Sequence, residues 1–300
     1  QAWEACITLG TAWQFQPTNE TYKTGGHVIR LLTDTRAKGG SLLLNVGPDA
    51  LGKLCPEQEG VLRELALWHF INGECLHDTR PWVLTNEEDT YLLKAKDGSA
   101  VYAVLLGEKN WKRGERREVI LRSVAITESS RISVLGISGE LTEYRPDIDA
   151  RPYMKQQEDG LHLSLMNAQR IYCGTDWPGP LVVKITDPRP AFLPLAVETL
   201  TEDEDITLGN GGAVLRARVL SMGSFDRAEL SFHIRVYPGF ALSSYEEGWE
   251  TISGEEVTET GVYSTSVSNL KGGVTYQFRA VLSNEKTSVK GELALFVAEE

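Results

Sequence analysis

The sequence predicts a multi-domain protein that combines α/β with all-β structure, namely the C-terminal remnant of a (β/α)8-like barrel followed by two antiparallel β-sandwich domains. Strand and helix patterns alternate up to residue 79, whereas short strand patterns follow one another from about residue 80 with no helical pattern between them. Prolines at 188, 190 and 194 indicate a linker. We therefore expect domains at 1–79, 80–188 and 189–300.

The first part has the strand–helix–strand–helix order of a parallel α/β fold. A strand pattern covers 5–9, and a helical apolar face follows and ends at Gly39 and Gly40. The continuous apolar run 42–46 is typical of a buried parallel strand, and Pro56 opens a second helix that Asn72 and Gly73 close. Because the sequence begins almost directly on a strand, we expect the earlier strands of the barrel to lie upstream.

The remaining chain shows only strand and turn patterns. Asp97 and Gly98 separate two strand patterns and predict a hairpin. The strands expected after residue 80 cover 90–96, 100–106, 118–122, 131–135, 161–165, 181–186, 213–220, 230–237, 262–268, 274–283 and 292–297.

Composition excludes several classes of function. The net charge of −12 argues against a nucleic-acid partner, which requires a basic surface. No run of about 18 apolar residues is present, so we expect no membrane span. The cysteines have neither Cys-x-x-Cys spacing nor histidines at metal-ligand spacing, so we expect no metal and no cofactor; they are Cys6, Cys55, Cys75 and Cys173.

Three residues near the predicted parallel strands carry suitable chemistry. Glu4 is either a catalytic carboxylate or a structural ion-pair partner. Trp13, in the loop after the first strand, is either a flat surface for the apolar face of a sugar or ordinary packing. Asn45 either orients a catalytic carboxylate or satisfies loop amides, while Gly47 permits close backbone approach.

Two motifs resemble a known enzyme family. The strings are Trp3-Glu4-x-Cys6-x-Thr8 with Trp13, and Lys38-Gly39-Gly40-x-Leu42-Leu43-Leu44-Asn45-Val46-Gly47-Pro48. Both are similar to the α-L-fucosidases of glycoside hydrolase family 29. The resemblance covers residues 1 to about 80 and extends, with less specific sequence, through the predicted sandwich at 80–188. Separately, residues 270–280 resemble the corner before the penultimate strand of fibronectin type III modules, where a tyrosine commonly bonds back to the preceding turn.

The resemblance implies a retaining glycosidase with two carboxylates. Its aspartate nucleophile is expected on an earlier barrel strand, outside this chain. Glu4 matches the acid/base position of one branch of the family, and in the other branch that group comes from a loop upstream. Trp13 matches an aromatic residue beside the fucose C5 methyl group. Trp3 is expected to bind substrate as well, and Asn45 to support the residues that do.

The resemblance also implies the partner and the compartment. We expect a fucosylated glycan as substrate of a secreted or periplasmic exo-α-L-fucosidase, with the signal sequence upstream of this chain. Because only one part of the barrel is expected here, the isolated chain is predicted to be inactive. The alternative is a pair of non-catalytic β-sandwich modules that bind carbohydrate or act as spacers in a larger glycan-degrading protein.

Overall fold

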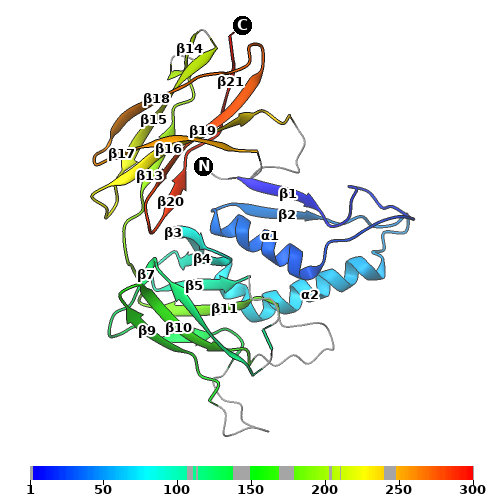
Figure 1. The fold of residues 1–300 in the computed structure, drawn as a ribbon. Coiled ribbons are helices and arrows are strands. Elements are labelled where there is room, and N and C mark those ends of the chain that lie inside the picture. The colour runs from blue at the N-terminus through cyan, green and yellow to red at the C-terminus, as the bar shows by residue number, and fades with distance from the viewer. Residues whose placement is uncertain are drawn as a thin grey trace. The chain divides into compact units, whose positions relative to one another are not determined.

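The computed structural model describes residues 3–106, 111–112, 114–137, 149–168, 179–202, 205–209, 211–239 and 248–299. Over these residues the protein is mostly β-sheet with two α-helices (Figure 1). The chain divides into two compact units, Gln1–Ala191 and Phe192–Glu300. Neither helix is long and apolar enough to cross a membrane. The division into domains at 1–79, 80–188 and 189–300 stays a prediction.

The first unit begins with a parallel strand pair. Strand β1 (Glu4–Thr8) pairs with β2 (Ser41–Asn45), so that Glu4 lies opposite Ser41 and Thr8 lies opposite Asn45. Helix α1 (Gly25–Ala37) connects the two strands and lies beside them (Figure 1). The expected βαβ order is therefore present, and both strands lie within one residue of their predicted ranges.

The end of α1 and both ends of α2 lie where the sequence predicts them, and the structure adds the start of α1. Thr24 caps α1 by accepting a hydrogen bond from the His27 amide at 3.2 Å. Gly39, with φ of 82°, follows the end of α1 in the left-handed conformation that favours glycine. Helix α2 (Pro56–Asn72) starts at its proline and continues into a 3₁₀ turn, η1 (Gly73–Cys75).

The helices share a core with an antiparallel sheet. This five-stranded sheet has the order β3 (Thr79–Glu87), β4 (Thr90–Ala95), β5 (Ala100–Leu105), β11 (Leu181–Thr186), β8 (Ile132–Val134). Ile29 and Trp68 of the helices are buried with Leu93 and Val104 of the sheet. The Trp68 indole N–H also donates to the Pro180 carbonyl at 2.9 Å. The α/β segment is therefore packed on the strands that follow it.

A second sheet covers the other face of β3–β4–β5–β11–β8. It has the order β6 (Arg116–Leu121), β10 (Gly160–Met166), β9 (Tyr153–Gln157), and a short pair joins β7 (Val124–Ala125) to β12 (Arg189–Pro190). One buried cluster draws side chains from both sheets, including Leu92, Val183, Leu121 and Leu163. The predicted hairpin is present, because β4 and β5 are antiparallel neighbours and Gly98 has φ of 78°.

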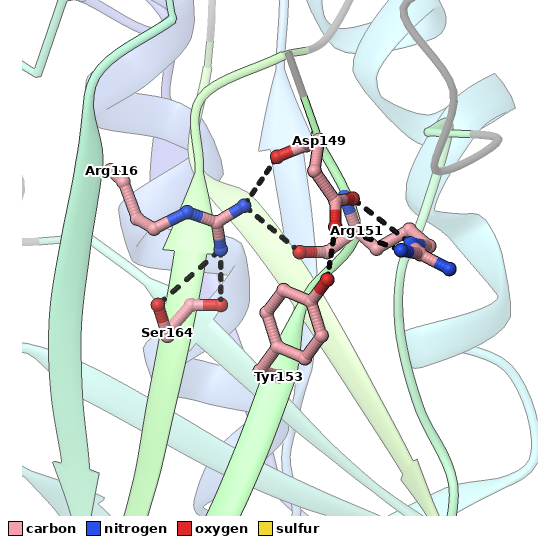
Figure 2. Close-up of polar contacts among 5 residues, drawn as sticks. All are labelled: Arg116, Asp149, Arg151, Tyr153 and Ser164. Atoms are coloured by element: carbon pink, nitrogen blue, oxygen red, sulfur yellow. Dashed lines mark hydrogen bonds and ion pairs between the residues drawn. The ribbon is translucent and has the colours of Figure 1, made fainter. Parts of the chain in front are cut away.

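Arg116 ties the strands of the smaller sheet to the chain that leads into β9 (Figure 2). Its guanidinium donates to the carbonyl oxygens of Asp149 at 2.6 Å, Arg151 at 3.1 Å and Ser164 at 3.0 Å. The Asp149 carboxylate accepts hydrogen bonds from the side chains of Arg151 and Tyr153, and these bonds hold its pKa well below its usual range. Backbone oxygens here take the place of a counter-ion for Arg116.

The second unit consists of two antiparallel sheets around a separate core. One sheet contains β13 (Ala196–Thr199), β14 (Thr207–Gly209), β15 (Gly212–Ser221) and β18 (Gly261–Val267); the other contains β16 (Ala228–Val236), β17 (Glu250–Val257), β19 (Thr275–Ser283), β20 (Ser288–Lys290) and β21 (Ala294–Val297). Leu215 and Phe278 are fully buried between them. The Lys271 amide donates to the Tyr276 hydroxyl at 3.0 Å, as the corner motif predicts.

Candidate functional site

The candidate site lies at the carboxyl ends of β1 and β2. The two strands are parallel, so these ends meet at one edge, where α/β folds commonly place their active sites. The Leu9 amide donates to the Asn45 carbonyl at 2.8 Å and extends the pairing by one residue. The loops 9–24 and 46–55 leave this edge; Trp13 lies in the first of them, and Asn45 is the last residue of β2.

Trp13 is presented to solvent by a fixed backbone. Its side chain is 56% exposed. The Asn45 side-chain amide donates to the Trp13 carbonyl oxygen at 2.8 Å, so the end of β2 fixes the loop that follows β1. Asn45 thus positions Trp13 through its backbone and leaves the indole ring free to contact a ligand.

Gly47 brings the two loops into contact. A Cβ atom at this position would lie 2.9 Å from the Phe15 nitrogen, which is closer than a side chain tolerates. The Gln58 amide holds Gly47 from α2: its Oε1 accepts from the Gly47 N–H and its Nε2 donates to the Gly47 carbonyl, both at 2.9 Å. Gln58 is only 1% exposed. The predicted close approach at Gly47 is confirmed, and Gln58 enforces it.

The base of the 9–24 loop is held by charged groups. The Glu20 carboxylate accepts from the Thr11 hydroxyl and amide, both at 2.7 Å, and these bonds lower its pKa. The Lys23 ammonium donates to the carbonyl oxygens of Thr8 at 2.6 Å and Gly10 at 3.3 Å. Glu20 is therefore an ionised hydrogen-bond acceptor within the loop, which does not suit a proton donor.

Tyr22 and Cys55 link the two loops. The Cys55 thiol donates to the Tyr22 hydroxyl oxygen at 3.3 Å. This hydrogen bond, together with burial of the ring, raises the pKa of Tyr22 to about 12. Tyr22 is consequently neutral at physiological pH, as is typical of a structural contact. Cys6 and Cys75 are free thiols like Cys55, while Cys173 lies outside the described residues.

Glu4 and Trp3 lie at the opposite end of the strand pair. Glu4 is the first residue of β1, is exposed, and accepts from the Ser41 hydroxyl at 3.1 Å. The Trp3 indole N–H donates to the Lys38 carbonyl at 3.3 Å, and its ring packs against Gly40. Four residues of strand correspond to about 13 Å. The structure thus brings Trp13 and Asn45 together and separates them from Glu4 and Trp3, whose roles stay predictions.

Sequence reasoning missed the residues that hold the loop. Gln58 and Lys23 both bind backbone oxygens of residues more than ten positions away. Gln58 stands between two glutamates at the start of a helix, a pattern that normally indicates an exposed turn. No sequence signal distinguishes it from a surface residue.

Comparison with known proteins agrees with the motifs. A sequence model of the family described as Alpha-L-fucosidase matches residues 1–74. Tissue alpha-L-fucosidase of Rattus norvegicus is 32% identical over 143 residues, which are 46% of this chain and 30% of that protein. The Mus musculus protein is 31% identical over 144 residues, or 47% of this chain and 31% of its own length. The chain thus spans less than a third of the curated relatives it matches.

A solved structure is also similar. Alpha-L-fucosidase isoenzyme 1 from Paenibacillus thiaminolyticus aligns with a TM-score of 0.45 at 22% identity, covering 62% of this chain and 39% of that one. The resemblance that the sequence predicts is confirmed by the match over residues 1–74 and by the curated relatives. The chain is an α-L-fucosidase-like protein.

Proposed function

We propose that the chain is the carboxyl-terminal part of a retaining exo-α-L-fucosidase that removes terminal α-L-fucose from glycans, and that it supplies one aromatic wall of the sugar site. The observation that carries the proposal is the exposed Trp13 ring on a loop fixed at the carboxyl edge of a parallel strand pair. Fucose presents an apolar methyl group, and a flat indole ring covers such a group well. The segment that bears Trp13 is also the segment that matches the family.

The hydrogen bonds of the loop explain how Trp13 would act. Asn45 fixes the backbone at Trp13, and Gln58 fixes the backbone at Gly47 in the facing loop. The indole ring is therefore positioned before a sugar binds. Preorganisation of this kind reduces the entropy lost on binding. Covering one methyl group contributes about 0.8 kcal/mol, and a larger apolar contact contributes somewhat more. Trp13 should therefore change KM by up to about tenfold and kcat by less.

We further propose that both catalytic carboxylates belong to parts of the enzyme other than this chain. A retaining mechanism requires two carboxyl groups about 5–5.5 Å apart. Glu4 lies at the wrong edge for a partnership with Trp13, and Glu20 is occupied by Thr11. The matched residues make up only 30% of the rat relative, which also supports placing both carboxylates outside this chain. On this proposal β1, α1, β2 and α2 complete a (β/α)8-like barrel, and the antiparallel sheets form β-sandwiches.

Kinetic assays with an aryl α-L-fucoside test these proposals. The purified chain should show no turnover above the buffer blank, and turnover would reject the assignment of both carboxylates to other parts. In the full-length protein that contains this chain, Trp13→Ala should raise KM by up to about tenfold. Phe70→Ala is the control, since Phe70 is an exposed aromatic residue of α2 outside the candidate loops. Equal effects of the two substitutions on KM would reject the role of Trp13.

A further inference from the structure

Two histidine side chains lie together on the surface where α2 ends. The Nε2 atoms of His69 and His77 are 2.9 Å apart. Their rings are nearly perpendicular, with an interplanar angle of 87° and centroids 4.9 Å apart. Both residues are exposed. The pair lies in the helix end and turn after residue 68, away from the loops that carry Trp13 and Asn45.

The backbone of the turn holds the two histidines in place. The Gly73 amide donates to the His69 carbonyl, and the His77 amide donates to the Gly73 carbonyl at 3.1 Å. A Cβ atom on Gly73 would lie 3.1 Å from His69 Cε1, so the ring folds over the glycine. Trp68 and Leu76, next to the two histidines in the chain, are buried. The backbone that carries both rings is therefore anchored by the core.

We propose that His69 and His77 bind one divalent transition-metal ion through their Nε2 atoms, with water molecules as the remaining ligands. Neutral imidazole is a preferred ligand of Cu²⁺, Ni²⁺ and Zn²⁺. Metal–nitrogen bonds of about 2.0–2.1 Å place two ligands at right angles about 2.9 Å apart, and two tetrahedral ligands about 3.3 Å apart. The observed separation of 2.9 Å matches the right-angle arrangement that Cu²⁺ and Ni²⁺ adopt in tetragonal sites.

The surroundings limit the site to these two protein ligands. Among the residues that the structure describes, no group of three or more His, Cys, Asp or Glu side chains is placed to hold a metal ion. The nearby carboxylates are occupied: Asp78 pairs with Lys96 at 3.0 Å, and Glu74 binds the Lys184 ammonium and the Tyr102 hydroxyl. A bound ion would keep open positions toward solvent.

Isothermal titration of the tag-free chain with NiCl₂ tests the proposal. The wild-type protein should show one saturable site per chain. His69→Gln and His77→Gln should each weaken binding about a hundredfold, because either change removes one arm of a chelate. His27→Gln is the matched control, since His27 is exposed on α1.

Thermal unfolding in the presence of Ni²⁺ gives a second measurement. A ligand that binds only the folded chain raises the unfolding temperature. The increase should occur in the wild-type protein and in His27→Gln, and should vanish in the two other variants. Absence of a saturable site, a site unchanged by either substitution, or a site lost in only one of the two variants would each overturn the proposal. The pair would then be a hydrogen bond between two histidine rings and nothing more.

Discussion

Replacing Gln58 with alanine should loosen the loop that carries Trp13. The side chain of Gln58 forms the bidentate contact with the Gly47 backbone, and Gly47 in turn touches the backbone at Phe15. Without the Gln58 amide, the N–H and C=O of Gly47 lose their partners beneath the loop. The substitution therefore acts on Trp13 from a buried position, through backbone atoms alone.

The magnitude follows from the two hydrogen bonds. Each buried backbone group left without a partner costs about 1–3 kcal/mol. Both bonds to Gly47 are only part-buried, so water recovers some of this loss. We expect about 2–4 kcal/mol of destabilisation in the first unit. For a unit of this size 1 kcal/mol lowers the unfolding temperature by about 2–4 °C, so the expected decrease is about 5–15 °C.

Hydrogen exchange by mass spectrometry locates the effect. Peptides that cover 9–24 should exchange faster in Gln58→Ala, while the strands of the second unit serve as an internal reference because they form a separate compact unit. Gln58→Glu separates hydrogen bonding from volume: a carboxylate still accepts from the Gly47 N–H but no longer donates to its carbonyl. Gln14→Ala makes the same truncation at an exposed position of the loop.

Comparison of these variants tests whether the hydrogen bonds between Gln58 and the Gly47 backbone hold the loop. Gln58→Glu should lie closer to Gln58→Ala than to the wild-type protein, because it loses one bond and places a charge against a carbonyl oxygen. Gln14→Ala should leave the unfolding temperature nearly unchanged. An unfolding temperature and exchange pattern for Gln58→Ala equal to those of Gln14→Ala would refute the reasoning.

Further predictions concern the glycine, the smaller sheet and the strand carboxylate. Gly47→Ala should destabilise the first unit by about 1–3 kcal/mol in urea denaturation, because the loop backbone must move away from the new methyl group. His162 lies between Asp159 and Glu118, each at 2.8 Å, and these bonds raise its pKa above the ordinary 6.5. Its contribution is complete below that ordinary value and is lost as pH rises through the raised pKa. Once exchange is corrected for its intrinsic pH dependence, protection of β9 and β10 should therefore fall as pH rises above 6.5 in the wild-type protein, and less in His162→Gln. Glu4→Gln in the full-length protein should slow good and poor leaving groups equally, without rescue by azide; a selective loss of about 10²–10⁴-fold with poor leaving groups, and rescue, would show that Glu4 is the acid/base.

Elements with strong local signals are predictable from this sequence. Pro56 starts α2 and Gly39 follows the end of α1, because each residue has a conformational preference that is independent of tertiary structure. Strands β3 and β9 were not expected as strands. Strand β3 contains Pro81 and is an edge strand, where proline is tolerated, and β9 is a largely exposed edge strand without apolar alternation. Edge strands leave little hydrophobic pattern for sequence analysis to detect.

The candidate site was predictable only in part. Trp13 comes after the first strand pattern and Asn45 lies near the end of the second, so the sequence places both near the edge where parallel strands end. Glu4 comes before the first strand pattern, so the same reasoning places it at the opposite edge; its residue type and the family resemblance made it a candidate. The roles of Gln58 and Lys23 depend on backbone oxygens, which every residue possesses. Contacts of that kind leave no trace in residue type.

The hydrogen bond from Trp68 to Pro180 limits where the gene for this protein can be divided or recombined. It joins residues 112 positions apart and closes a core that contains both helices and the strands β4, β5 and β11. A gene cut near residue 80 would separate the two halves of that core and expose both. Recombination between related proteins should therefore exchange residues 1–191 as one piece, with the crossover at the boundary between the two compact units, Ala191 and Phe192.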